Sequence, residues 1–153
     1  MGEGEISMER ISRRTLMGLL PMAVLAAVRA DAQGTAVVYK DPSCGCCTKW
    51  ADLLRREGFA VTLKNITDLD QKYIVPSNLH GCHTAIVGGY IIEGHVPPAD
   101  VTRLVKQKLA VAGLAVPGMP IGSPGMEVQG VAPQPYKVLA FMRDGKTRVF
   151  ASY

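Results

Sequence analysis

Three of the four cysteines in this chain lie within four positions, in Cys44-Gly45-Cys46-Cys47, and the fourth, Cys82, follows far along the sequence. Cys44 and Cys47 have the Cys-x-x-Cys spacing of a redox pair, and Cys46 adds a third thiol between them. A thiolate is both the nucleophile of disulfide exchange and a ligand for soft metal ions. The cysteines therefore predict either redox chemistry or metal binding.

The segments around the three clustered cysteines predict a β-α-β unit. Residues 35–39 form a short, β-branched apolar run, and residues 59–66 alternate between apolar and polar side chains, which indicates two strands. Between them, apolar residues recur every three or four positions from Cys46 until Gly58, which is typical of a helix, with Ser43 as its predicted N-cap. The cysteines then lie at the helix N-terminus, where unpaired N–H groups favour the thiolate.

The rest of the chain adds a second helix, a long loop and two hairpins. Pro97-Pro98 opens the helix, and residues 113–135, rich in glycine and proline, are predicted to be loop throughout. The hairpins are residues 84–87 and 90–93 around Gly88-Gly89, and residues 136–141 and 146–150 around Asp144-Gly145.

This order of elements predicts an α/β, thioredoxin-like fold. We expect a central mixed sheet flanked by helices, with a Gly/Pro/Met-rich loop and a C-terminal hairpin. In such a fold the strand that begins near residue 84 starts opposite the cysteine turn. Cys82 is therefore expected to join the other three sulfurs.

Residues 1–32 have the pattern of an export signal. A charged region with Arg13-Arg14 precedes an apolar run over residues 16–28 and the small-x-small site Ala30-Asp31-Ala32. The arginine pair is similar to a twin-arginine signal, with an ordinary secretory signal as the alternative. The apolar run is shorter than the roughly 20 residues of a membrane-spanning helix. We therefore predict a removed signal peptide (1–32), and a periplasmic thioredoxin-like metal-binding domain (33–153) without a membrane segment.

Composition excludes several other classes of protein. A hydrophobic content of 48% argues against intrinsic disorder. The net charge of +4 is spread without a run of basic residues, so no nucleic-acid partner is expected. A mature domain of about 120 residues builds a core without disulfides, which leaves the cysteines available for chemistry.

Thiol–disulfide exchange is one candidate function, with Cys44 attacking and Cys47 resolving. Thioredoxin-like oxidoreductases place a cis-proline opposite the redox pair, whereas His83 occupies the corresponding position here. The extra thiols of Cys46 and Cys82 would also interfere with a dithiol cycle. Two structural disulfides are a further alternative, which the adjacency of Cys46 and Cys47 disfavours because each would need a different partner.

Metal binding is the other candidate function, and the sulfur donors leave Cu(I), zinc and iron–sulfur clusters open. Structural zinc sites usually use two Cys or His pairs, and this chain has one. Adjacent Cys46 and Cys47 point in different directions from a helix, which bridging thiolates in a multinuclear Cu(I) cluster accommodate. An oxidising periplasm favours copper over exposed iron–sulfur clusters. We predict a Cu(I) thiolate cluster, with an iron–sulfur or other soft-metal site as the alternative.

Four other residues are candidate ligands beside the cysteines. His83 follows Cys82, and His95 follows the first hairpin. The thioethers of Met119 and Met126, in the long loop, suit Cu(I), although methionine more often fills gaps in packing.

The sequence resembles the CopG-like family of exported, copper-resistance-associated proteins, long catalogued as a domain of unknown function. The resemblance implies a thioredoxin-like fold and Cu(I) held by the four cysteines. It further implies periplasmic copper handling with copper ions and other copper-handling proteins as partners, and an oxidoreductase role toward copper has been suggested. The stretches that carry it are Tyr39-Lys40-x-Pro42-x-Cys44-Gly45-Cys46-Cys47-x-Lys49-Trp50, Cys82-His83-Thr84-Ala85, Gly89-Tyr90-x-x-Glu93-Gly94-His95-Val96-Pro97 and Gly118-Met119-Pro120-x-Gly122-Ser123-Pro124-Gly125-Met126-Glu127.

Overall fold

The computed structural model describes residues 33–66 and 75–153. The predicted signal peptide and its cleavage site lie outside the described residues, as do residues 67–74. Within the described part of the chain, no helix has the length and apolar character needed to cross a membrane.

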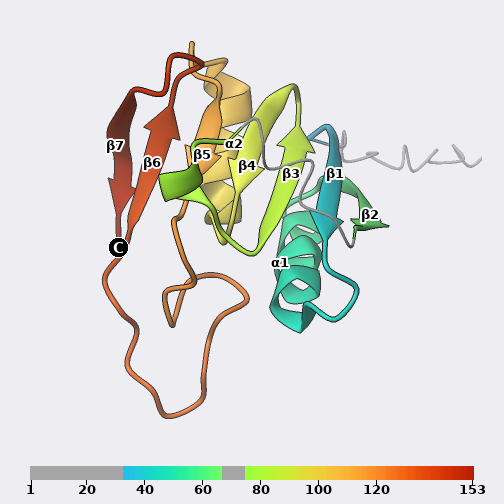
Figure 1. Ribbon diagram of the computed structural model, residues 1–153. Coiled ribbons are helices and arrows are strands. Elements are labelled where there is room, and N and C mark those ends of the chain that lie inside the picture. Colours follow the sequence, from blue (N-terminus) through green and yellow to red (C-terminus); the bar gives the residue numbers. More distant parts are fainter. Residues whose placement is uncertain (1–32, 67–74) are drawn as a thin grey trace, which may run out of the picture.

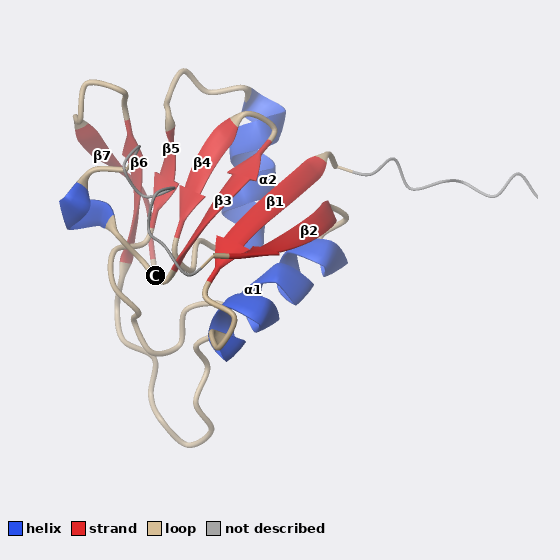
Figure 2. Cartoon of the chain, turned by 45° about the vertical axis from the view of Figure 1, so that its right-hand side comes forward, coloured by secondary structure: helices blue, strands red, loops and turns tan. Residues whose placement is uncertain are grey.

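One seven-stranded sheet carries the fold, in the order β2-β1-β3-β4-β5-β6-β7 (Figures 1 and 2). Strands β1 and β2 are parallel, as are β4 and β5, whereas the other neighbouring pairs are antiparallel. The sheet is therefore mixed, which confirms the predicted α/β class and is consistent with a thioredoxin-like fold. The strands are β1 (Thr35–Lys40), β2 (Ala60–Asn65), β3 (His83–Val87), β4 (Tyr90–Glu93), β5 (Gly113–Ala115), β6 (Lys137–Phe141) and β7 (Thr147–Ser152).

Two α-helices, α1 (Gly45–Arg56) and α2 (Pro98–Gln107), cover the same face of the sheet (Figure 2). Trp50 of α1 and Leu104 of α2 are fully buried in one apolar cluster with sheet residues such as Val38 and Ile92. Full burial of a side chain of this kind stabilises the fold by roughly 1.5–3 kcal/mol. On the opposite face, a smaller cluster combines Phe141 with Leu79 of the 3-10 helix η2 (Ser77–Leu79).

The prediction that residues 113–135 are loop throughout is wrong at its start, because Gly113–Ala115 form β5. This strand joins the two predicted hairpins into one sheet by pairing with β4 and with β6. A Cβ at Gly113 would overlap the carbonyl oxygen of Ile91, so the close approach of β5 to β4 requires glycine. The same glycine weakens the sequence pattern of a strand.

The remainder of that segment, from residue 116 to β6, is a long loop that extends beyond the sheet toward the start of α1 (Figure 1). Gly125 makes the contact there. Its backbone has φ of +86°, and a Cβ on it would lie 2.9 Å from the carbonyl oxygen of Cys46. The loop is thus packed directly against the turn that carries the clustered cysteines.

Candidate metal centre

The cysteine turn is held by hydrogen bonds on both sides of Cys44. Before it, one carboxylate oxygen of Asp41 accepts from the Ser43 backbone N–H at 2.8 Å and from the Ser43 hydroxyl at 2.5 Å. Ser43 is therefore not the helix cap. Cys44 takes that position, and its sulfur accepts from the backbone N–H of Cys47 at 3.3 Å.

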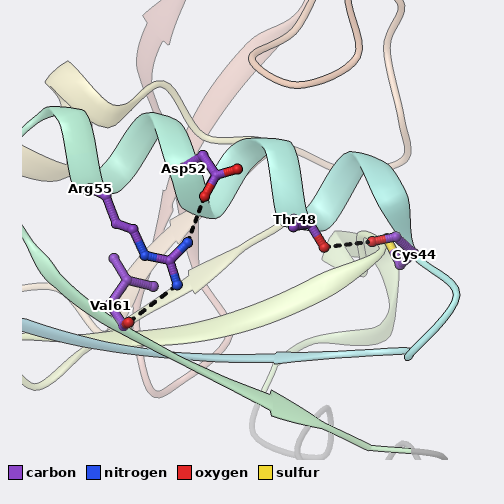
Figure 3. Close-up of polar contacts among 5 residues, drawn as sticks. All are labelled: Cys44, Thr48, Asp52, Arg55 and Val61. Atoms are coloured by element: carbon purple, nitrogen blue, oxygen red, sulfur yellow. Dashed lines mark hydrogen bonds and ion pairs between the residues drawn. The ribbon is translucent and has the colours of Figure 1, made fainter.

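The helix continues the turn without a break. The Thr48 hydroxyl donates to the carbonyl oxygen of Cys44 at 3.3 Å (Figure 3). In the last turn of α1, Arg55 bonds Asp52 at 2.6 Å and the carbonyl oxygen of Val61 at 3.3 Å, which links the helix to the neighbouring β2 (Figure 3). The cysteines consequently sit at the N-terminus of a helix that is anchored along its length, where the helix dipole favours thiolate.

All four cysteine sulfurs converge, and each lies within 4.8 Å of the others. The sulfurs of Cys44 and Cys47 are joined as a disulfide in this structure. Cys46 Sγ lies 3.5 Å from Cys44 Sγ, and Cys82 Sγ lies 3.4 Å from Cys47 Sγ. The adjacent Cys46 and Cys47 thus face different neighbours, as expected for consecutive helical residues. Cys47 is buried, whereas the other three are partly exposed.

His95, two residues after the end of β4, contacts Cys82 and is fully buried. Its Nε2 lies 2.8 Å from Cys82 Sγ, and its Nδ1 lies 2.8 Å from the carbonyl oxygen of Pro124. A carbonyl only accepts hydrogen bonds, so Nδ1 carries the proton and Nε2 directs a lone pair at the sulfur. Burial lowers the pKa of His95, which the Pro124 carbonyl and the charge of Glu127 partly oppose. A neutral imidazole with its second nitrogen fixed in this way is the form that binds metals.

His83 completes a second group of donors, in which Cys82, His83 and His95 lie within 4.8 Å of one another. Its Nδ1 is 3.3 Å from Cys82 Sγ, and its ring lies between those of Trp50, at 4.5 Å, and His95, at 5.1 Å. The described residues contain no cis peptide bond. The position opposite the Cys-x-x-Cys pair is therefore filled by an imidazole on a trans backbone.

The two methionines differ in exposure. Met119 is 55% exposed, and Met126 is partly buried next to Gly125, which packs on the cysteine turn. A ligand role for either thioether stays a prediction. The third histidine, His80, is partly buried, and its Nε2 lies 3.0 Å from the carbonyl oxygen of Val75.

Two charged side chains beside this site are buried, which the sequence did not predict. Lys40 ends β1, and its ammonium group donates to the carbonyl oxygens of Asp41, at 2.8 Å, and Pro42, at 3.4 Å, in the turn before Cys44. Glu93 ends β4 and accepts hydrogen bonds from residues on either side of Cys82-His83. Both residues stand in the stretches that carry the family resemblance, but only the three-dimensional contacts show what they hold.

Fold and site together define an α/β protein of thioredoxin-like architecture that has converging thiolate and imidazole donors suited to a soft metal ion. Two solved structures, described as "Copper resistance protein copG", Form 1 and Form 2, resemble it closely. They are 40% and 39% identical to this chain, each with a TM-score of 0.73 over 78% of it, and 97% and 98% of their own lengths are covered.

A family model, "Protein of unknown function, DUF411", matches residues 79–126. This range includes Cys82, both site histidines and the first half of the long loop. A search of the curated proteins finds no match. On the identity and coverage of the two solved structures, the chain belongs to the CopG-like family, as the sequence motifs indicated.

Proposed function

We propose that this protein binds copper as Cu(I) in a multinuclear thiolate cluster built on Cys44, Cys46, Cys47 and Cys82. The observation that carries the proposal is the convergence of all four sulfurs within 4.8 Å of one another. Sulfur donors select soft ions such as Cu(I). The similar structures are described as copper resistance proteins, which supports copper over other soft metals.

The arrangement of the sulfurs favours several ions over one. Cys46 lies beside Cys44, and Cys47 lies beside Cys82, so the two adjacent cysteines serve opposite sides of the group. Thiolates that bridge two ions use such positions without unwinding the first turn of α1. His83 and His95 extend the donor set on the Cys82 side, and Met119 and Met126 are the remaining candidates.

The biological role we propose is copper handling or resistance outside the cytoplasm, after export directed by residues 1–32. Copper ions are the cargo, and other periplasmic copper-handling proteins are the partners to which the ions pass. Thiolate and imidazole donors side by side suit both oxidation states of copper, and this supports redox cycling between Cu(I) and Cu(II) as an accompanying activity.

An anaerobic Cu(I) titration of the reduced protein against a competing chelator tests the proposal, with native mass spectrometry to count the ions. We expect several copper ions bound tightly per chain, and a lower count in Cys46→Ser. Thr48→Ser, a change on the same helical turn that retains the hydroxyl, serves as the control and should bind like the wild type. Failure of the reduced wild-type protein to take up Cu(I) would contradict the proposal.

A second candidate function is thiol–disulfide exchange, and the Cys44–Cys47 disulfide favours it. In this reaction the Cys44 thiolate of the reduced protein attacks a substrate disulfide, and the Cys47 thiolate then displaces the reduced substrate. The Cys44–Cys47 disulfide is the product, and an added dithiol such as dithiothreitol reduces it again. Insulin reduction by the wild type, retained in Cys46→Ser but lost in Cys44→Ser, would support this function. The copper proposal instead requires that Cys46→Ser alter the metal content.

A further inference from the structure

Glu93, at the end of β4, is fully buried and is not among the proposed copper ligands. Its Oε1 accepts from the backbone N–H of Gly81 at 2.6 Å, and its Oε2 accepts from the hydroxyl of Thr84 at 2.5 Å. These two donors lie immediately before and after Cys82-His83. We propose that Glu93 is a positioning residue of the copper site, which holds these two ligands in register with His95. The inference rests on the proposed function.

Backbone contacts also hold the segment that carries Cys82 and His83 against Glu93 and Gly94. The N–H of Gly94 donates to the carbonyl oxygen of His83 at 2.9 Å. Gly81 packs so tightly that a Cβ on it would lie 2.6 Å from the Cα of Gly94. Glu93 is itself fixed from the other side, because its carbonyl oxygen accepts from the N–H of Val116 at 3.0 Å. The segment that carries Cys82 is therefore held against Glu93 and Gly94.

The contacts of Glu93 with the Cys82 segment matter because Cys82 is the one cysteine that does not belong to the turn at the start of α1. Its sulfur must lie both 3.4 Å from Cys47 Sγ and 2.8 Å from His95 Nε2. His95 is two residues from Glu93, so a single side chain sets the position of Cys82 relative to the imidazole that it meets. A shift of this segment would separate the sulfur and nitrogen donors.

The length and the charge of the Glu93 side chain can be changed separately by substitution. Glutamine has the same length; its oxygen accepts from Gly81, and its NH₂ donates to the hydroxyl oxygen of Thr84. Aspartate keeps the carboxylate but is one methylene shorter, so it cannot reach both donors. A positioning role therefore predicts that Glu93→Gln is tolerated and Glu93→Asp is not.

The experiment measures the Cu(I) affinity of the reduced protein by chelator competition, together with the thiolate-to-copper absorption per bound ion and the denaturation midpoint. Glu93→Asp and Glu93→Ala should weaken Cu(I) binding about 10–100-fold, the usual effect of removing a residue that orients a metal ligand. Glu93→Gln should bind like the wild type. Asp100→Ala is the matched control, because Asp100 is also buried and hydrogen-bonded, but to Tyr153 and Arg103.

Asp100→Ala should lower the denaturation midpoint and leave copper affinity unchanged. If Glu93→Ala does not fold, the comparison of Glu93→Asp with Glu93→Gln decides the question. Wild-type affinity in Glu93→Asp would overturn the inference. A loss in Glu93→Gln as large as that in Glu93→Asp would also overturn it, because a positioning role requires the length of the side chain and not its charge. Failure of the wild type itself to bind Cu(I) would instead overturn the proposed function.

Discussion

Replacing Gly125 by alanine tests whether the long loop positions the site. Gly125 has φ of +86°, and an added Cβ would lie 2.9 Å from the carbonyl oxygen of Cys46 and 3.1 Å from the backbone nitrogen of Trp50. Both neighbours belong to the backbone of α1 and cannot move aside like the end of a side chain. We therefore expect the loop to move away from the helix, taking the Pro124 carbonyl from His95.

The expected loss of folding free energy in Gly125→Ala is the sum of two costs. An alanine with left-handed φ costs roughly 1–2 kcal/mol, and loss of the Pro124–His95 hydrogen bond costs about 1 kcal/mol. Gly130→Ala is the control, because Gly130 has φ of +77° but no atom within 4 Å of an added Cβ. Gly130→Ala should therefore show only the cost of the left-handed φ. Gly125→Ala should thus be about 1 kcal/mol less stable than Gly130→Ala.

Chemical denaturation of both reduced variants measures the difference in stability. The nitrogen NMR shifts of the His95 ring report whether Nδ1 still carries the proton. Loss of that tautomer in Gly125→Ala, with weaker Cu(I) binding than in Gly130→Ala, is the expected result. Equal stability of the two variants with an unchanged His95 tautomer would refute the idea that this loop orients the imidazole.

Three further predictions concern the disulfide, the second group of donors and the C-terminus. Protein oxidised at Cys44–Cys47 should bind fewer copper ions than reduced protein, because two thiolates are removed; equal uptake in native mass spectrometry would contradict this. His95→Ala should weaken Cu(I) binding in chelator competition more than His80→Ala, since His95 Nε2 alone of the two faces Cys82 at 2.8 Å. Burial and the hydrogen bond to a carboxylate raise the pKa of Tyr153 to about 12. Its contribution to stability is present below its unfolded pKa of about 10 and is lost toward pH 12, so Tyr153→Phe should flatten that decline in denaturation midpoints.

Much of the fold follows from periodicity and turn residues. The β-α-β unit, the two hairpins and the helix after Pro97-Pro98 lie where the pattern predicts them. β5 was missed because its three residues have no pattern of their own, and it exists as a strand only through its neighbours β4 and β6. The cap of α1 was misplaced by one residue because Asp41 engages the Ser43 hydroxyl and leaves Cys44 to cap the helix.

The sequence predicts which residues supply the metal donors, but it predicts less well which residues hold those donors in place. Four cysteines and a thioredoxin-like order of elements predict that the sulfurs meet, since the fold itself brings the start of β3 to the start of α1. The direct contact of His95 with Cys82 depends on how residues beyond β4 turn back, which no local pattern encodes. The burial of Glu93 and Lys40 was not predicted, because a charged residue at a strand end is ordinarily exposed.

X-ray absorption spectroscopy at the copper edge of the reduced, Cu(I)-loaded protein tests the central claim most directly. A cluster built on the four converging sulfurs predicts a first shell dominated by sulfur, together with copper–copper scattering from bridged ions. Nitrogen or oxygen donors alone, or sulfur donors without any copper–copper contribution at full loading, would contradict a multinuclear thiolate site.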